Sequence, residues 1–322
     1  MKISERITPN PEDAKKVHVV SFSGGRTSAY LVAFMEMMRK TFGWEVHYIF
    51  MDTGAEHPKT YEFIKKIVKK WGIEITLLRA KVIDELGQGT TYREISMDEL
   101  KPDLQPWIDM IKKYGLPTIN APRCTSRMKT EPHDKYCDER WGRGNYETWL
   151  GIRIDEPKRL KHWSPTPDLF GQPNPPKRPI RYLAELSKYG KQNILDWWKS
   201  QAFDLNLPEY LGNCVFCIKK ALPKLIAAAI AERKMGEQFC ETLKRDDVRI
   251  LESNAIQGQE IYRNYISMDK ILKQALLSNL DDIEEIIEGN YTFEEDEDTL
   301  CAESCEIFSD EFELKFMEYQ AA

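Results

Sequence analysis

Short, evenly apolar segments alternate with amphipathic ones in the first part of the chain. Three apolar segments, Val17–Phe22, Val46–Met51 and Ile73–Leu78, have the length of buried strands. Between them, Ser28–Lys40 and Lys59–Lys70 repeat apolar residues at helical spacing. This alternation of strand and helix predicts an α/β fold built on a doubly wound, mainly parallel sheet.

A fourth strand is predicted at Thr148–Ile154. In doubly wound sheets, ligands bind beyond the carboxyl ends of the parallel strands, so the residues that follow each strand form the candidate site. These segments are 21–28, 52–56, 79–81 and 151–159, and they are polar, charged or glycine-containing. The sequence therefore predicts one ligand site along this edge of the sheet.

The second half of the chain follows a different pattern. Residues 164–181 contain six prolines, which exclude a regular helix or a central strand and predict a long excursion, either a lid or a mobile loop. Helical periodicity returns in Asn193–Ala202, Ile218–Met235 and Tyr262–Glu288. We therefore expect a helical C-terminal part that begins at residue 182.

These patterns divide the chain into an α/β domain over residues 1–181, a helical part over 182–288 and an acidic, weakly ordered tail over 289–322. Residues 281–322 hold sixteen Asp and Glu but one Lys, so the preceding residues carry nine more basic than acidic side chains. Such a body suits a phosphate-bearing ligand, from a nucleotide to a nucleic acid. A solvated basic face is the alternative interpretation.

The sequence also limits the compartment. No run of eighteen apolar residues occurs, and the first twenty residues lack the apolar segment of a signal peptide. We expect a cytoplasmic protein without membrane contact. Seven cysteines in such a chain indicate metal or redox chemistry rather than a disulfide framework.

The segment SFSGGRTS joins the first predicted strand to the first helix. Its glycines let backbone N–H groups approach a ligand closely, and the N-terminus of a helix favours an anion. Hydroxyls and a guanidinium add donors suited to phosphate or sulfate. The candidate anion ligands are Ser21, Ser23, Gly24, Gly25, Arg26, Thr27 and Ser28. The glycine spacing matches neither the Walker A loop nor the Gly-x-Gly-x-x-Gly fingerprint, and a tight turn with an N-cap is the alternative.

Three motifs, in order over residues 17–160, resemble those of a known family. Ser23–Ser28 resembles the Ser-Gly-Gly-x-x-Ser pyrophosphate loop of the PP-loop, or adenine nucleotide alpha-hydrolase-like, superfamily. Asp52-Thr53-Gly54, with Glu56, Pro58 and Thr60-Tyr61, is similar to the Asp-Thr-Gly…Pro-Glu-Thr segment of the phosphoadenosine phosphosulfate (PAPS) reductase family. Gly151–Glu156 with Arg159 resembles that family's Gly-x-Arg-x-x-Glu segment. The resemblance implies a Rossmann-like fold of this superfamily.

The resemblance also implies roles for these residues. The residues expected to hold the phosphates of an adenine nucleotide, ATP or a sulfonucleotide, are Ser23, Gly24, Gly25 and Ser28. Arg153, a candidate catalytic residue, and Arg159 are expected to supply positive charge there, with solvated surface arginines as the alternative. Asp52, the other catalytic candidate, precedes Thr53 and Gly54 in the same site, where it positions a ribose or a metal-bound water or merely caps the approach to a helix.

Cys214 and Cys217 form a C-x-x-C, and two thiolates at this spacing can face one metal or cluster. The pair alone fits zinc, an iron–sulfur cluster or a redox dithiol. Cys124 and Cys137 lie upstream and Cys240 lies downstream. More ligands are needed to choose among the three chemistries.

The segment that begins at Cys124 resembles the Cys-Thr-x-x-x-Lys-x-x-Pro motif found in PAPS-reductase-like proteins. Adenylyl-sulfate reductases hold a [4Fe–4S] cluster with a Cys-Cys pair and a C-x-x-C, and the DNA-phosphorothioation sulfur-transfer relatives use four cysteines. Here Arg123 replaces one cysteine of the pair, so Cys137 is chosen as the fourth ligand and Cys240 is the reserve. A [4Fe–4S] cluster is expected, and zinc or unligated redox cysteines are the alternatives.

The C-terminal tail departs from the reductase pattern. PAPS reductases act through a cysteine in a Glu-Cys-Gly-Leu-His segment, which this sequence lacks. Cys301 and Cys305 occupy a comparable place without the flanking residues. Either a mobile tail brings one of these thiols to a bound sulfonucleotide, or both are incidental surface thiols.

Three functions follow from these expectations. The first is an enzyme that binds an adenylyl sulfonucleotide and reduces its sulfur with the help of a thiol reductant. The second is ATP-pyrophosphatase-type sulfur transfer from a sulfur donor to a nucleic acid, or its modification, although Arg26-Thr27 stands where many ATP-splitting relatives have Lys-Asp. The third is a nucleotide sensor without catalysis.

Overall fold

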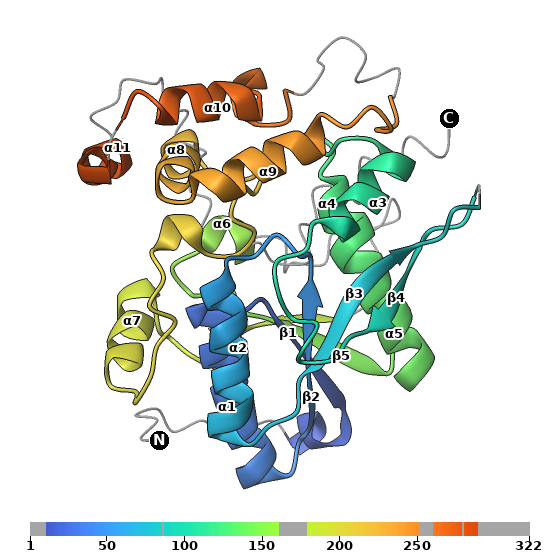
Figure 1. Ribbon diagram of the computed structural model, residues 1–322. Helices are drawn as coiled ribbons and strands as arrows, with labels where there is room; N and C mark the ends of the chain where they lie inside the picture. Colours follow the sequence, from blue (N-terminus) through green and yellow to red (C-terminus); the bar gives the residue numbers. More distant parts are fainter. Residues whose placement is uncertain (1–10, 86, 161–178, 251–259, 279, 289–322) are drawn as a thin grey trace, which may run out of the picture.

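The computed structural model describes residues 11–85, 87–160, 179–250, 260–278 and 280–288 (Figure 1). Within them, one sheet has the strand order β4-β3-β2-β1-β5-β6. The strands are β1 (Val17–Phe22), β2 (Glu45–Asp52), β3 (Thr76–Val82), β4 (Thr90–Glu94), β5 (Tyr146–Leu150) and β6 (Ile180–Tyr182). Neighbouring strands are parallel except β3 and β4, which are antiparallel. The predicted α/β fold with a mainly parallel sheet is confirmed.

Helices cover both faces of this sheet. The helices of the α/β part are α1 (Arg26–Phe42), α2 (Pro58–Trp71), α3 (Gln105–Tyr114), α4 (Arg123–Thr125), α5 (Glu131–Trp141) and α6 (Pro157–Leu160). Side chains alternate along β1, so Val20 and Phe22 pack in the cluster that includes α1 and α2, whereas Val19 packs with α5 on the other face. The larger cluster also takes in the helical C-terminal part.

That helical part consists of α7 (Lys191–Lys199), α8 (Leu222–Ala231), α9 (Arg233–Leu243), α10 (Met268–Ala275) and α11 (Ile283–Glu288). Figure 1 shows α8, α9 and α10 above the strands, at the carboxyl end of the sheet, whereas α7 lies beside α1. None of the described helices is both long and apolar enough to cross a membrane.

Two predicted strands are displaced by a few residues. β3 starts at Thr76 instead of Ile73, because Ile73 and Ile75 are buried in the approach to the strand without joining its ladder. β5 covers Tyr146–Leu150, since its register with β1 begins where Tyr146 faces Val17. Residues 151–154 therefore belong to the loop after the strand, where the candidate arginine lies.

Two edge strands were not predicted. β4 reads TTYRE, is only partly buried and pairs with β3 at the sheet edge. β6 is three residues long, and its first two residues end the proline-rich segment 164–181. A short edge strand tolerates neighbouring prolines, since its outer side needs no ladder hydrogen bonds. The remainder of that segment up to residue 178 lies outside the described residues, as does the tail 289–322 with Cys301 and Cys305.

The two longest predicted C-terminal helices are wrong as single helices. Residues 218–235 contain the end of a turn, α8 and the start of α9, with a break at Glu232, whose φ and ψ are −128° and 54°. Residues 262–288 divide into α10 and α11 with 3₁₀ turns, and Ser267 caps α10 by accepting from the Lys270 N–H. Apolar periodicity continues through both breaks, so the pattern alone did not reveal them.

Candidate functional site

The loop between β1 and α1 requires glycine at position 24, whereas position 25 has space for a side chain. Gly24 has φ +79°, and a Cβ there would lie 2.7 Å from Cγ2 of Thr60 on α2. Gly25 has an ordinary φ of −93°, and a Cβ there would meet nothing closer than Ser23 Oγ at 3.7 Å. Gly24 therefore fixes the turn against α2, whereas Gly25 leaves the N-terminus of α1 accessible to a ligand.

Hydroxyls are arranged around this turn. The Oγ atoms of Ser23 and Ser28 lie 2.9 Å apart, and Ser28 Oγ also accepts from the Ser23 N–H at 3.2 Å. Gly25 is the N-cap of α1, and no side chain caps the helix. The first turn of α1 thus presents N–H groups and hydroxyls together, which is the arrangement that binds phosphate or sulfate. Ser21, by contrast, is buried within β1.

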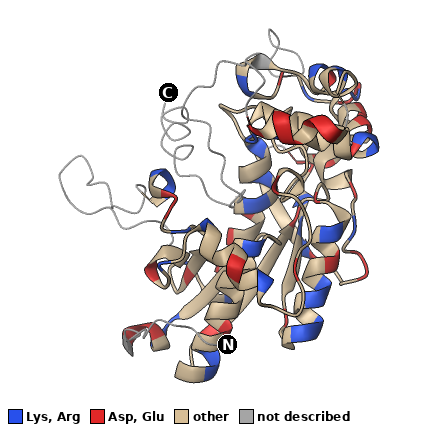
Figure 2. Ribbon diagram, turned by 90° about the vertical axis from the view of Figure 1, so that its left-hand side faces the viewer, with Lys and Arg blue, Asp and Glu red and all other residues tan. Residues whose placement is uncertain are grey.

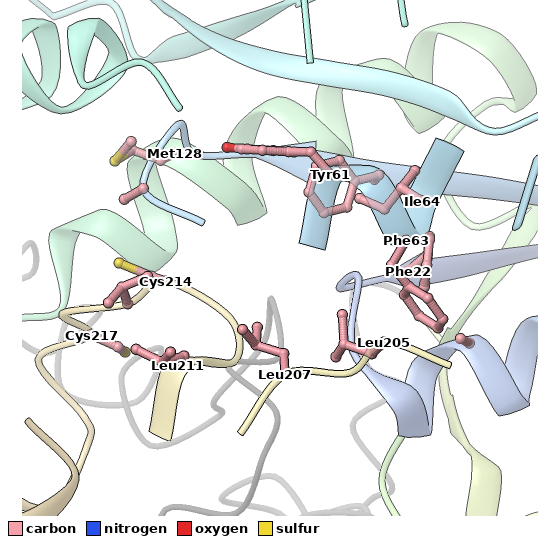
Figure 3. Close-up of a cluster of buried hydrophobic side chains, with 14 of the residues drawn as sticks. Phe22, Tyr61, Phe63, Ile64, Met128, Leu205, Leu207, Leu211, Cys214 and Cys217 are labelled. Atoms are coloured by element: carbon pink, nitrogen blue, oxygen red, sulfur yellow. The ribbon is translucent and has the colours of Figure 1, made fainter. Parts of the chain in front are cut away.

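A pocket opens at this turn. One wall is the predicted loop, and the other is a segment that the sequence did not indicate, Leu205–Asn213. The lining residues are Ser23, Gly25, Arg26, Thr27, Ser28, Leu205, Leu207, Pro208, Glu209, Gly212 and Asn213. Figure 3 shows Leu205, Leu207 and Leu211 along the chain that leads to Cys214 and Cys217. The only signal for this wall in the sequence was its position immediately before the C-x-x-C.

The guanidinium of Arg26 bonds to the second wall of the pocket. Its Nε and Nη2 donate to the Asp204 carboxylate at 2.8–3.1 Å, and its Nη1 donates to the Leu207 carbonyl at 3.1 Å. Arg26 lines the pocket but fastens α1 to the second wall, because its side chain is held by that segment. Its expected role as a phosphate ligand therefore stays a prediction.

Arg153 joins the loop after β5 to the first turn of α1. It is 4% exposed, and its Nη1 donates to Thr27 Oγ1 at 3.1 Å. Its Nε donates to Asp155 at 2.9 Å, and its main-chain N–H donates to Glu156 at 2.9 Å. The structure thus brings this arginine to the anion turn. Arg159 lies farther along the loop, where its Nη1 donates to the other oxygen of Glu156 at 2.7 Å.

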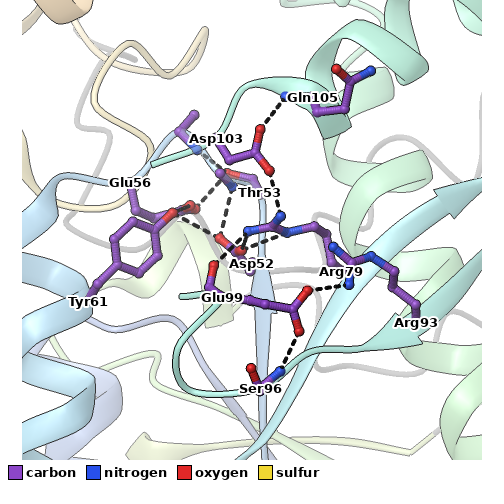
Figure 4. Close-up of polar contacts among 12 residues, drawn as sticks. Asp52, Thr53, Glu56, Tyr61, Arg79, Arg93, Ser96, Glu99, Asp103 and Gln105 are labelled. Atoms are coloured by element: carbon purple, nitrogen blue, oxygen red, sulfur yellow. Dashed lines mark hydrogen bonds and ion pairs between the residues drawn. The ribbon is translucent and has the colours of Figure 1, made fainter. Parts of the chain in front are cut away.

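Asp52 is not placed as expected. It is fully buried, and Oδ1 accepts from the Gly54 N–H and the Tyr61 hydroxyl, each at 2.9 Å. Oδ2 accepts from Nε of Arg79 at 2.9 Å and from its Nη2 (Figure 4). All four lone-pair positions of the carboxylate are therefore used within the protein. Asp52 is a structural residue here, which corrects its expected contact with a ribose or a metal-bound water.

Thr53 and Gly54 are also structural. A Cβ at Gly54 would lie 1.8 Å from the Asp103 carbonyl oxygen, and the Asp103 N–H donates to the Gly54 carbonyl at 2.9 Å. The Thr53 hydroxyl donates to Glu56 Oε1 at 2.7 Å. Burial and the nearby Asp52 raise the pKa of Glu56. The motif after β2 therefore shapes the sheet edge, and no atom of Asp52, Thr53 or Gly54 lines the described pocket.

The motif after β2 also contacts the C-x-x-C segment. Glu56 and Cys214 form an antiparallel bridge, and the Val215 N–H donates to the Ala55 carbonyl at 3.0 Å. The Cys217 N–H donates to the Cys214 carbonyl at 3.2 Å, closing a turn between the two cysteines. The cysteine turn is thereby fixed to the edge of the sheet beside the anion turn.

The five described cysteines fall into two groups. Cys137 is buried on α5, in the cluster that covers one face of the sheet. The others belong to, or pack against, the cluster on the opposite face, and they are Cys124, Cys214, Cys217 and Cys240. Cys137 therefore lies across the sheet from the C-x-x-C, which corrects its choice as the fourth ligand. The reserve residue, Cys240, is buried in the same cluster as Cys214 and Cys217.

Tyr262 lies among these four thiols. It is fully buried and donates its hydroxyl to the Phe216 carbonyl at 3.1 Å. Burial raises the pKa of Tyr262 well above its ordinary value, and negative charge on four nearby cysteine sulfurs, when they ionise, raises it further. Those four are Cys214, Cys217, Cys240 and Cys124. Burial likewise raises the pKa of Cys240 to about 11.

Donor chemistry and burial at this cysteine group match a thiolate-ligated cluster or metal. In the described part of the chain, no three His, Cys, Asp or Glu side chains are close enough together to hold a single metal ion. A [4Fe–4S] cube separates its thiolates more widely than one metal ion does, because each thiolate binds a different iron. The four cysteines therefore match a cluster by ligand type, and they share one region of the fold.

The turn at the N-terminus of α1, at the carboxyl edge of a doubly wound sheet, defines a nucleotide-binding α/β protein. Residues 17–165 match the model of the phosphoadenosine phosphosulfate reductase domain. The chain is 44% identical over 304 residues to the uncharacterized nin region protein ORF290 of Escherichia phage lambda, covering 93% of this chain and 98% of that protein. It is 29% identical over 146 residues to the uncharacterized protein MJ0066 of Methanocaldococcus jannaschii, covering 44% of this chain and 24% of that protein.

The chain belongs to the phosphoadenosine phosphosulfate reductase domain family, within the PP-loop, or adenine nucleotide alpha-hydrolase-like, superfamily. Membership supports nucleotide binding and a relation to sulfur chemistry. The matched region covers the anion turn, the motif after β2 and the loop that carries Arg153. It ends before the C-x-x-C and the second wall of the pocket.

Proposed function

We propose that this protein is an enzyme that binds an adenylyl nucleotide at the anion turn and carries out sulfur chemistry at the adjacent cysteine group. One observation carries the proposal: Gly212 and Asn213 line the pocket at the turn, and the next residue is Cys214. A nucleotide whose phosphates occupy the turn therefore lies next to the C-x-x-C segment.

The phosphates would accept hydrogen bonds from the first N–H groups of α1 and from the hydroxyls of Ser23 and Ser28. Arg153, held by Thr27 and Asp155, adds positive charge beside them. Glu209 also lines the pocket, but it forms ion pairs with Lys191 and Lys224, which compensates for its charge. The wall is thus compatible with an anion.

A [4Fe–4S] cluster would be held by Cys124, Cys214, Cys217 and Cys240. Zinc, the alternative occupant, would require these side chains to move closer together. The cluster supplies redox chemistry or a site for sulfur when it is bound. The cysteine turn keeps two of these thiols at the sheet edge through the bridge between Glu56 and Cys214. Cys214, Cys217 and Cys240 are buried, which limits the access of water to their sulfurs, whereas Cys124 is partly exposed.

The first candidate reaction is the reduction of a sulfonucleotide. A cysteine thiolate that is not a cluster ligand attacks the sulfur of the sulfate group, the S–O bond to the nucleotide breaks, and the adenosine 5′-phosphate moiety leaves with the electron pair. A second thiol then attacks the resulting S-sulfocysteine, so sulfite leaves and a disulfide forms. An external dithiol reductant restores the thiols. Arg153 is suited to stabilise the charge on the departing phosphate.

The second candidate is ATP-dependent sulfur transfer to a nucleic acid. The specific observation that favours it is the cationic segment around Cys124, where Arg123 and Arg127 flank the cysteine. In this reaction, adenylation of the acceptor releases pyrophosphate and activates it toward a sulfur nucleophile. The outer sulfur of a donor persulfide attacks the activated acceptor, and the nucleotide monophosphate leaves with the electron pair of the broken bond. A thiol then attacks the donor's own sulfur, so the S–S bond breaks, a disulfide forms and the transferred sulfur stays on the acceptor.

One set of assays separates the candidates. Anaerobically purified protein is analysed for iron, zinc and acid-labile sulfide, then incubated with PAPS, adenylyl sulfate or ATP in the presence of a dithiol. Sulfite formation supports the reductase, and pyrophosphate that depends on added RNA or DNA supports sulfur transfer. If the protein binds these nucleotides without forming either product, it is a sensor and the proposed enzyme is wrong.

A further inference from the structure

Four cations gather at the C-terminal end of α3, and we call them the α3 basic surface: Lys113, Arg123, Arg127 and Arg249. They come from α3 itself, from the Cys124 segment and from the chain after α9. Figure 1 shows α3 beside α4 near one end of α9. On the side drawn in Figure 2, by contrast, basic and acidic residues are interspersed along the helices.

Main-chain carbonyls of this helix end hold two of the arginines. Arg249 donates its N–H to the Ile111 carbonyl at 3.1 Å and its Nη1 to the Lys113 carbonyl at 2.9 Å. Arg123 donates Nη1 to the Leu116 carbonyl at 3.0 Å. The C-terminus of a helix attracts cations, which explains the position of one or two such side chains. Each of these two guanidinium groups is bonded there through a single nitrogen.

Carboxylates compensate for only part of this charge. Arg127 forms an ion pair with Glu131. Lys113 donates its three Nζ–H groups to the carbonyls of Ile83, of Glu85 at 3.1 Å and of Gln88 at 2.6 Å, which are neutral groups. Within the described residues, the side-chain hydrogen bonds of Lys113, Arg123 and Arg249 all end on carbonyl oxygens. In the part of the chain that the structure describes, no carboxylate therefore neutralises these three cations, and Arg123 and Arg249 keep further N–H donors for an external anion.

Mutual repulsion supports the same conclusion. Arg123 is partly buried, and it lies in the electrostatic field of two like charges, Arg127 and Arg249. A half-buried guanidinium beside two like charges is stabilised when an anion binds. The guanidinium of Arg127 also lies over the Tyr114 ring, 4.7 Å from its centroid, so an aromatic side chain belongs to the same surface. Cations interleaved with an aromatic ring are typical of surfaces that contact nucleic acid strands.

We propose that the α3 basic surface binds the phosphodiester backbone of a nucleic acid and places it beside Cys124. The planar guanidinium groups match phosphate oxygens, and their spread over three segments suits successive phosphates rather than a single ion. The binding surface is separate from the pocket at the anion turn. It therefore stands whether the nucleotide reaction is reductive or transfers sulfur.

The test is fluorescence anisotropy of a labelled 20-nucleotide single strand and of the matching duplex, titrated with full-length protein over about 50–200 mM salt. Arg249→Gln should weaken binding about three- to tenfold and make the slope of log Kd against log salt shallower by about one. The control is Arg233→Gln, an exposed arginine on α9 that pairs with Glu237. Unchanged affinity and slope in Arg249→Gln, or an equal loss in the control, would overturn the proposal.

Competition identifies the anion. The labelled strand should be displaced by unlabelled oligonucleotide at a far lower phosphate concentration than by inorganic phosphate. Equal displacement would mean a single-anion site, and stronger displacement by polyglutamate at equal charge would mean an acidic peptide partner; either outcome rejects a nucleic acid. Arg249→Gln should keep the affinity for adenine nucleotide. A wrong proposal for the α3 basic surface is therefore distinguishable from a wrong proposal for the nucleotide pocket.

Discussion

Arg153 donates to the hydroxyl of Thr27 at 3.1 Å and so connects two segments that lie 126 residues apart. Thr27 is in the first turn of α1, and Arg153 follows β5, which pairs with β1. Because adjacent parallel strands end at the same edge of a sheet, the loop after β5 reaches the helix that follows β1. This contact places a buried guanidinium at the anion turn.

Thr27→Val should weaken the binding of an adenylyl nucleotide several-fold, because the isosteric side chain no longer accepts from Arg153. A hydrogen bond to a charged group contributes about 1.5–3 kcal/mol. Isothermal titration calorimetry with ATP and PAPS measures the change. Thr242→Val is the control, since Thr242 is also a buried helical threonine but donates to Gln238 far from the site. Equal affinity in both variants would remove the contact from nucleotide binding.

Gly25→Asp should reduce nucleotide affinity at least tenfold while the protein keeps its fold. Gly25 has an ordinary φ and open space around its Cα, and aspartate is a favourable N-cap residue. The added carboxylate repels a phosphate at the helix N-terminus. Gly25→Asn is the matched control, because it fills the same space without the charge and should lose less affinity. A thermal melt checks the fold, and equal loss in both variants would indicate a steric effect alone.

Gly24→Ala should destabilise the protein by about 2–4 kcal/mol, because strained backbone and a close contact add together. The φ of +79° is unfavourable for alanine, and the new methyl would lie 2.7 Å from Thr60 Cγ2. Gly43→Ala has φ +71° with nothing within 4 Å of the new Cβ, so it should lose only about 1–2 kcal/mol. Urea denaturation measures both. Combining Gly24→Ala with Thr60→Ser should restore part of the difference; no recovery would contradict the contact.

Acid should weaken the helix that follows the anion turn through Glu36. Burial alone would raise the pKa of this carboxyl, but hydrogen bonds from Arg39, Tyr48 and Lys40 outweigh burial and lower it to about 2. The folded-state pKa lies below the unfolded value, so this stabilisation is complete above about pH 4.5 and is lost as the pH falls toward 2.

Glu36→Gln should therefore cost up to about 3 kcal/mol at neutral pH and much less near pH 2. Urea denaturation at pH 7, 5, 4 and 3 measures this dependence. Glu12→Gln, which alters an exposed carboxylate, is the control. If the free energies of unfolding of Glu36→Gln and the wild type change with pH in parallel across this range, Glu36 does not cause the loss of stability in acid.

Cys240→Ser should lower the iron and sulfide content of anaerobically purified protein, whereas Cys137→Ser should leave it unchanged. Cys240 shares the environment of Tyr262 with the C-x-x-C, and Cys137 lies across the sheet. Both cysteines are buried, so the pair controls for the general effect of a buried serine. Colorimetric iron and sulfide analysis with the visible absorption spectrum gives the answer. Loss of iron in Cys137→Ser alone would restore the ligand set expected from the sequence.

The sequence revealed those strands that are buried on both faces of the sheet. β1 and β2 are buried over almost their whole length, so their apolar runs are unambiguous. The edge strand β4 is only partly buried, and β6 has three residues, so neither has a strong pattern. The breaks between C-terminal helices depend on backbone geometry at single residues such as Glu232, which apolar periodicity does not encode.

The site was predictable where the chemistry is local. Ser23, Gly25 and Ser28 lie on one turn, so their proximity followed from the sequence. Asp52 has the residue type of a ligand, but its neutralisation by Arg79 depends on the register of β2 with β3. Cys137 was closer in sequence to Cys124 than Cys240 was, yet the direction in which α5 faces the sheet separates the pair. These outcomes depend on tertiary packing.

The segment Leu205–Asn213 can differ between relatives while the matched domain stays the same. It forms the second wall of the pocket and is fastened to α1 through Arg26 and Asp204, yet it lies outside residues 17–165. Two proteins can thus share the whole matched domain and still present different shapes and charges to the ligand. Exchanging this short stretch between homologues is a direct route to a new substrate preference, because the phosphate-binding turn itself stays unaltered.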